Sequence, residues 1–353
     1  MPKRKPSRRE LLRGQNLFDE KTPEEKPAES PFLRITTDAM AGQFEIFLNA
    51  RRENDGTEAA LEALELPARI EAQLSIFQPD SPVSRLNREA AILPVPVDDD
   101  LFNLLVFCKN LYDETEGAFD PTAGPLSDVW GFSRREGRIP TDEELEVARH
   151  AVGMHLVELD PAGKTVRFTH PDVKLNLGAV GKGYAIDRLV ESMLEQGVDD
   201  FMVHAGMSSV AARGNFGSDP SPYSKRSGWS VGIHDPLRHN RRLGEIHLHD
   251  RALATSGSEK QFFRHRGRRF SHIIDPRTGQ PAEGLLSVTL LAPSAATADA
   301  LATAMFVLGA DWTLGYTESH PELAVLLIQG NRGKQTKILT HGFDAGELRI
   351  VDK

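Results

Sequence analysis

One stretch of the chain has the residue types needed to bind a phosphate. Residues 176–187 contain three glycines and Lys182 immediately before a predicted helix, so backbone N–H groups and a cation can approach an anion there. The spacing is not that of a Walker A loop, because Gly178 and Gly181 are too close together and no Ser or Thr follows the lysine. A tight turn from strand to helix is the alternative interpretation of the same glycines.

A second segment offers oxygen ligands for a metal ion. Asp299 and Thr303 are four residues apart in the predicted helix 297–308, which stacks a carboxylate and a hydroxyl on one face. Hard oxygen ligands of this kind suit Mg²⁺, whose other ligands would be water and substrate phosphate. The alternative is that Thr297 or Asp299 simply caps the helix.

A third segment, residues 271–279, holds a candidate base. A predicted strand with alternating residues leads through His272 into the turn 276–279 (PRTG). A histidine can accept a proton near neutral pH, although a histidine bonded to the backbone near a turn is the alternative. Asp275 either orients the imidazole or caps the turn.

The elements that must position these segments mix helices and strands without regular alternation. Predicted helices are 58–77 with a kink at Pro67 and one face formed by Leu61, Leu64, Ile70 and Leu74, then 98–115, one starting at Thr141 with a capping box, 183–195 and 297–308. Predicted strands are 43–48, the hairpin 155–160 and 164–170, short strands between 201 and 291, then 323–328 and 335–340. This order predicts an α+β fold with largely antiparallel sheets and packed helices. The polar residues 1–31 are predicted to be a disordered tail, and 32–353 a single catalytic domain.

Composition excludes several classes of function. With 39% apolar and 26% charged residues, the chain has the composition of a soluble globular protein. A net charge of −9 argues against a nucleic-acid partner, which requires a concentrated basic face. No apolar run reaches the roughly 20 residues of a transmembrane segment. The single Cys108 cannot form an internal disulfide and is predicted to be buried. His247 and His249 lack a third ligand, so we interpret them as surface residues.

The N-terminal segment 7–13 (SRRELLR) is similar to a twin-arginine export motif. No apolar stretch follows the arginines, as a working export signal requires. We therefore expect a decayed signal or a basic tail, and a cytoplasmic protein.

Taken together, the motifs resemble those of the FAD:protein FMN transferases, the ApbE-like family. The resemblance covers nearly all of residues 32–330, and its seven motifs follow the family's order. These motifs are 39–42 (AMAG), 79–87, 117–126, the loop 178–183, 254–257 (ATSG), 272–276 (HIIDP) and the helix that carries Asp299 and Thr303.

The resemblance implies a role for particular residues. The residues that it implies for the FAD site are Met40, Phe77, Ala118, Phe119, Asp120, Asn176, Lys182 and Ile273. It implies that Mg²⁺ is held by the backbone carbonyl of Ala179 and the side chains of Asp299 and Thr303, and that His272 is catalytic. The implied reaction is phosphoryl transfer, in which a Ser or Thr hydroxyl of a client protein attacks the FMN phosphorus of FAD and AMP leaves.

Three positions depart from the family pattern. Asn176 stands where Asp is usual, Phe77 stands where an aromatic hydroxyl is usual, and 206–208 (GMS) replaces Gly-Gly-Asp or Gly-Gly-Asn. These departures bear on FAD affinity and client choice, because the implied metal ligands and His272 are unchanged. Two other functions stay open: a Mg²⁺-dependent FAD pyrophosphatase, in which water attacks, and a flavin-binding protein without catalysis.

Overall fold

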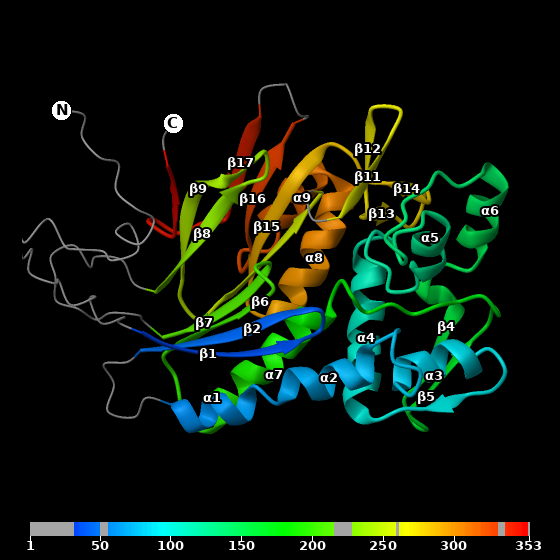
Figure 1. Cartoon of the computed structure of the whole chain (residues 1–353), viewed down its shortest axis with the longest axis horizontal. Coiled ribbons are helices and arrows are strands. Elements are labelled where there is room, and N and C mark those ends of the chain that lie inside the picture. Colours follow the sequence, from blue (N-terminus) through cyan, green and yellow to red (C-terminus); the bar gives the residue numbers. More distant parts are fainter. Residues whose placement is uncertain (1–31, 50–55, 215–227, 259–260, 331–335, 352–353) are drawn as a thin grey trace, which may run out of the picture. The chain divides into compact units, whose positions relative to one another are not determined.

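The computed structural model describes residues 32–49, 56–214, 228–258, 261–330 and 336–351 (Figure 1). The predicted N-terminal tail and its twin-arginine-like segment lie outside these residues. The helices are α1 (Thr57–Ala63), α2 (Leu66–Leu74), α3 (Pro82–Glu89), α4 (Asp99–Glu114), α5 (Gly124–Val129), α6 (Asp142–His150), η1 (Met154–Leu156), α7 (Gly181–Glu195), α8 (Ala295–Leu308) and α9 (Ala310–Glu318). The strands before residue 250 are β1 (Phe32–Ala39), β2 (Gly42–Asn49), β3 (Val95–Pro96), β4 (Val157–Asp160), β5 (Thr165–Phe168), β6 (Phe201–Ala205), β7 (Ser209–Arg213), β8 (Trp229–Asp235) and β9 (Arg238–Leu248). The later strands are β10 (Ala252–Gly257), β11 (Phe262–His265), β12 (Arg268–Ser271), β13 (Ile274–Asp275), β14 (Gln280–Pro281), β15 (Leu285–Ala292), β16 (Ala324–Gln329), β17 (Lys337–His341) and β18 (Leu348–Ile350).

The central element is an eight-stranded sheet in the order β1-β2-β6-β7-β10-β15-β16-β17. Every neighbouring pair in it is antiparallel. All eight residues of β15 are buried, so both faces of the sheet are covered there. The predicted α+β class with largely antiparallel sheet is confirmed.

Helices α7 and α8 cover one face of this sheet, and the small sheet β18-β9-β8 covers part of the other. Trp229 and Ile246 of the small sheet join Leu253 and Leu291 of the central sheet in one buried apolar cluster. The helices α3 to α6 lie to one side of α7 and α8 (Figure 1). The three layers place the N-terminal end of α7 and one face of α8 beside the end of β10, where the predicted phosphate and metal segments meet.

Local capping rules explain several helix ends. Thr141 and Glu144 form the predicted capping box at the start of α6, in which each side chain accepts from the other residue's backbone N–H. The predicted helix 58–77 is instead two helices, because Pro67 lacks an N–H and fits the first turn of a new helix rather than the middle of an old one. Leu61 is 57% exposed, so the prediction that it shares a buried face with Leu64 is wrong.

Cys108 is buried, and one of the two histidines His247 and His249 is nearly buried. Cys108 in α4 is fully buried, as predicted, and burial raises the pKa of its thiol well above the usual range. The side chain of His247 is only 11% exposed and lies 3.7 Å from Glu245, so the prediction of a surface residue is wrong for it. His249 is exposed, beside Asp250. Among the described helices, none combines the length and apolarity that a bilayer span demands.

Candidate active site

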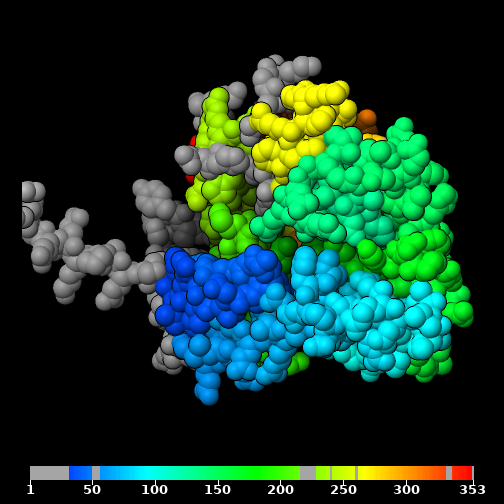
Figure 2. Space-filling model, turned by 45° about the vertical axis from the view of Figure 1, so that its right-hand side comes forward, coloured from blue at the N-terminus to red at the C-terminus, as the bar shows by residue number. Residues whose placement is uncertain are grey.

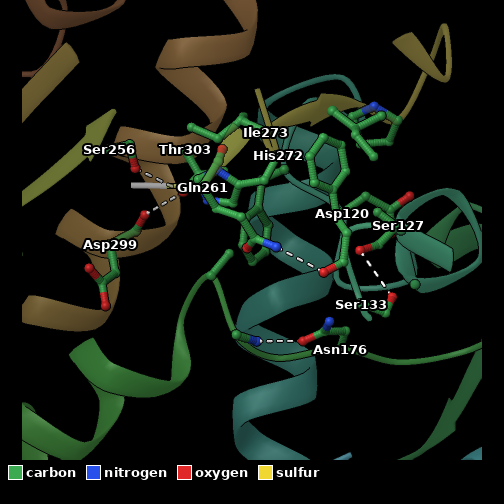
Figure 3. Close-up of a pocket in the computed structure, with 18 of the residues that line it drawn as sticks. Asp120, Ser127, Ser133, Asn176, Ser256, Gln261, His272, Ile273, Asp299 and Thr303 are labelled. Atoms are coloured by element: carbon green, nitrogen blue, oxygen red, sulfur yellow. Dashed lines mark hydrogen bonds between the residues drawn. The ribbon is translucent and has the colours of Figure 1, made fainter. Parts of the chain in front are cut away.

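One pocket of about 430 Å³ collects almost all the predicted site residues (Figure 3). The predicted residues that line it are Phe77, Ala118, Phe119, Asp120, Asn176, Ala179, Lys182, His272, Ile273, Asp299 and Thr303. Met40 is the predicted residue that does not line it. Met40 lies in the turn between β1 and β2 with a φ of 52°, and its N–H donates to Glu71. A Cβ on Gly181 would lie 3.1 Å from the Met40 Cε, so this residue contacts the start of α7 behind the pocket wall.

The predicted metal ligands form a network of oxygen atoms on one side of the pocket. Asp299 accepts hydrogen bonds from the Ser209 hydroxyl at 2.6 Å and from the Gly183 N–H at 2.7 Å. The Thr303 hydroxyl donates to the Asp299 carbonyl at 3.1 Å and lies 3.1 Å from the Ser256 hydroxyl. Figure 3 shows Ser256, Thr303 and Asp299 side by side. These bonds fix the orientation of the carboxylate and the hydroxyl before any ligand binds.

The donor set suits a hard divalent cation. Gly183 lies in the first turn of α7, where N–H groups have no partner within the helix, and its N–H donates to the Asp299 carboxylate rather than to the carbonyl of Ala179. The Ala179 carbonyl is therefore available to face the pocket, which Ala179 lines. A carboxylate has about four acceptor positions, so Asp299 can bind a cation and still accept its two hydrogen bonds. One carboxylate, one hydroxyl and one carbonyl, completed by water or phosphate, are ligands that Mg²⁺ accepts.

The predicted phosphate cradle of glycine N–H groups is not formed. The N–H of Gly178 donates to the Asn176 side chain, that of Gly181 to the Leu177 carbonyl, and that of Gly183 to Asp299. A Cβ on Gly183 would lie 2.1 Å from the Ala295 carbonyl oxygen, so this glycine is needed for the close approach of α7 and α8. Lys182, which lines the pocket, is the part of the loop that offers positive charge to an anion.

The imidazole of His272 is oriented by the backbone. Its Nδ1 lies 3.0 Å from the carbonyl oxygen of Gln261, which can only accept, so Nδ1 carries the proton in this contact. In that tautomer Nε2 is the acceptor nitrogen of the ring, the form that a general base requires. Asp275 does not orient the ring: its carboxylate accepts from Arg277 Nε at 2.9 Å, and its carbonyl accepts from the Gly279 N–H. It therefore caps the turn, the second of its two predicted roles.

Three further pocket residues are an exposed aromatic ring, an amide and a partly buried carboxylate. Phe77 is 78% exposed at the pocket edge and offers its face to a planar ligand. Asn176 keeps through its Oδ1 the hydrogen bond to the Gly178 N–H that an aspartate would make. Burial raises the pKa of Asp120 to about 6, although hydrogen bonds from the hydroxyl and N–H of Thr122 act in the opposite direction.

Several pocket residues were not predicted from the sequence. Ser127 and Ser133 lie opposite the metal ligands, with their hydroxyls 3.3 Å apart (Figure 3). Arg135 lines the pocket from the same loop, with a left-handed φ of 57°. Gln261 orients His272 through its carbonyl and donates from its side chain to the Phe132 carbonyl. No local pattern marks these residues, because the segments that carry them meet only in the folded chain.

Comparisons with known proteins agree on one family. The ApbE family model matches residues 40–327. An FAD:protein FMN transferase of Vibrio cholerae is 32% identical over 309 residues, covering 86% of this chain and 89% of that protein. The same-named protein of Haemophilus influenzae is 32% identical over 276 residues, covering 76% and 78% of the two chains. The crystal structure of the ApbE protein of Thermotoga maritima matches with a TM-score of 0.76 at 31% identity, covering 87% of this chain and 96% of that one. The chain therefore belongs to the ApbE family.

Proposed function

We propose that this protein transfers FMN from FAD to a Ser or Thr hydroxyl of a client protein, in a Mg²⁺-dependent reaction that releases AMP. The observation that carries the proposal is the common pocket of Lys182, His272 and the Asp299–Thr303 pair. An anion-binding cation, a candidate base and a set of hard oxygen ligands are the groups that phosphoryl transfer uses. The names of the Vibrio and Haemophilus relatives describe transfer of FMN from FAD to a protein, which supports the flavin-transfer part of the proposal.

The metal would be held by Asp299, Thr303 and the carbonyl of Ala179. When bound there, Mg²⁺ neutralises charge on the pyrophosphate of FAD and makes its phosphorus a better electrophile. Lys182 contributes a second positive charge to the same pocket.

The base and the ring-binding residues act on the two reactants. His272 takes the proton of the acceptor hydroxyl on Nε2, as that oxygen forms a bond to the FMN phosphorus. The bond between this phosphorus and the oxygen of the AMP phosphate breaks, and AMP leaves with the electron pair. Phe77 stacks on one of the planar rings of FAD, a role that does not need the hydroxyl usual at this position.

The test is to incubate the protein with FAD and Mg²⁺, with and without candidate flavoprotein clients, and to follow AMP and protein mass. AMP together with a client that gains the mass of FMN supports the proposal. AMP with free FMN, whether or not a client is present, means that water is the acceptor and the protein is a pyrophosphatase. FAD binding without AMP release means a flavin-binding protein without catalysis.

A further inference from the structure

The hairpin formed by β11 and β12 is the most basic surface segment close to the pocket. Residues 262–270 (FFRHRGRRF) contain four arginines and one histidine in a chain of net charge −9. The segment 264–268 is exposed throughout. The hairpin projects at the top of the view in Figure 1, and its yellow surface stands out at the upper edge of Figure 2.

The base of this hairpin is part of the pocket. Gln261 and His272 flank the two strands, are joined by the His272 N–H to Gln261 carbonyl hydrogen bond of 3.1 Å, and both line the pocket. The rings of Phe263 and Phe270 stack with centroids 5.1 Å apart, and Phe270 packs on Trp130 at 5.6 Å. The hairpin is therefore held in place beside the pocket residues Gln261 and His272. Each of its strands has four residues, so its tip lies about 13 Å from them.

The four arginine side chains of the hairpin differ in the contacts that they make. Arg268 pairs with Glu283 at 2.7 Å, and Arg269 lies 3.8 Å from the centroid of the Phe262 ring. Within the part of the chain that the structure describes, the side chains of Arg264 and Arg266 make no ion pair or hydrogen bond. Neither arginine lines the pocket.

The positions of these arginines oppose hairpin stability. Arg264 lies directly opposite Arg269 in the ladder, and like charges in such a pair are destabilising. Arg266 has a φ of 48° and Gly267 a φ of 81°, the conformation of a two-residue turn that prefers Asn or Gly at its first position. An arrangement that breaks local rules in this way is expected at a functional site.

We propose that the hairpin is a docking element for an acidic segment of the client protein. The inference rests on the proposed transfer to a client, whose acceptor hydroxyl must reach His272 in the pocket, at the base of the hairpin. Client residues next to that hydroxyl then lie along the hairpin, within reach of Arg264 and Arg266. Attraction between these arginines and acidic client residues raises the rate at which client and enzyme associate. It also fixes the orientation in which the acceptor hydroxyl reaches the pocket. Binding to a lipid surface would not require the arginines to lie beside the pocket, whereas binding to a client would.

The matched variants are Arg264→Thr with Arg266→Asn in one protein, and Arg69→Thr with Lys337→Asn in the control. Both pairs remove the same charge from exposed positions, and the control residues do not line the pocket. Threonine suits a strand and asparagine suits the first turn position, so the hairpin variant keeps its fold, with a Tm at or above that of the wild type. Both variants keep the wild-type affinity for FAD, measured by calorimetry, because none of the four substituted residues lines the pocket.

The probes are two fluorescent peptides that carry a single Thr beside a run of glutamates or beside a run of glutamines. We expect the wild type and the control variant to bind the glutamate peptide more tightly, and the hairpin variant to bind it roughly 10-fold more weakly than the wild type. Salt should weaken the wild-type preference. Equal binding of both peptides by the wild type, or an unchanged preference in the hairpin variant, overturns the proposal.

A second measurement tests whether the hairpin binds a lipid surface instead of a client. The wild type and both variants are sedimented with phosphatidylcholine vesicles that contain phosphatidylserine. Vesicle binding that depends on Arg264 and Arg266, with peptide binding independent of them, overturns the proposal. Peptide binding is measured without FAD, so it is independent of catalysis. If the glutamate peptide binds as expected but no protein ever gains FMN, the proposed function is wrong and the docking proposal is not. The failure of one proposal can therefore be distinguished from the failure of the other.

Discussion

Asp299 holds two neighbouring elements together as well as lining the predicted metal site, and two substitutions separate these roles. Its carboxylate accepts from the Gly183 N–H of α7 and from the Ser209 hydroxyl of β7. Asp299→Asn keeps both contacts, because the amide oxygen accepts from Gly183 and the amide nitrogen donates to the hydroxyl of Ser209. Asp299→Ala leaves both groups without a partner, and both residues are buried.

The two substitutions should have different effects on stability but similar effects on the reaction rate. Each buried group left without a partner costs about 1–3 kcal/mol, so Asp299→Ala should lower the free energy of unfolding by about 2–6 kcal/mol. Asp299→Asn should change it by less than about 1 kcal/mol. Both variants lose the only charged side chain among the predicted ligands, a loss of several kcal/mol in transition-state stabilisation that corresponds to about a 10³-fold fall in rate.

The assay combines urea unfolding with AMP release from FAD, in the presence of a client that accepts FMN, over a series of Mg²⁺ concentrations. If Asp299→Asn keeps the wild-type rate and the wild-type dependence on Mg²⁺, then Asp299 does not bind the metal. If Asp299→Ala unfolds at the same urea concentration as the wild type, the two hydrogen bonds do not stabilise the fold.

Four further predictions concern other parts of the site. His272→Ala should lose about 10²–10⁴-fold in transfer, keep FAD binding, and lack the fall in rate on the acidic side of a rate–pH profile; an unchanged rate would mean that another group is the base. FAD should bind with one-to-one stoichiometry and more tightly than FMN, which calorimetry measures and equal affinities would contradict. The raised pKa of Asp120, about 6 against 3.8, means that its contribution to stability is present below about pH 4 and lost as the pH rises through 6. Asp120→Asn should therefore raise the free energy of unfolding by about 1–3 kcal/mol at pH 7 and not at pH 4, as urea titrations at both pH values would reveal. Gly183→Ala should lower the free energy of unfolding by about 1–3 kcal/mol, because the new Cβ would meet the Ala295 carbonyl; a gain typical of Gly→Ala in a helix would refute the packing argument.

Features set by neighbouring residues were predictable from the sequence. The capping box of Thr141 and Glu144 needs only a spacing of three residues, and the α+β class follows from the order of periodic segments. The turn at 161–163 was predicted in the same way, since β4 and β5 form the expected hairpin around it. The split of the predicted helix 58–77 was missed, because Pro67 is compatible with both a kink and a helix start.

Features set by distant residues were not predictable. Gly183 is explained by Ala295, more than a hundred positions away, whereas the local pattern left a phosphate cradle and a tight turn as alternatives. The orientation of His272 depends on a carbonyl at Gln261, on the far side of a hairpin, while the nearer Asp275 pairs with Arg277. The sheet order also places β2 beside β6, across more than a hundred residues that form most of the helices. Spacing alone cannot identify partners that only the folded chain brings together.

The burial of Cys108 makes the protein convenient for spectroscopy. It is the only cysteine of the chain, it is fully buried, and its thiol stays protonated because burial raises its pKa. Thiol reagents act on the thiolate at accessible positions, so the native protein should remain unlabelled under ordinary conditions. A cysteine introduced at a chosen surface position would then be the sole reactive thiol. Fluorophores or spin labels can be attached site-specifically without first removing a native residue from the core.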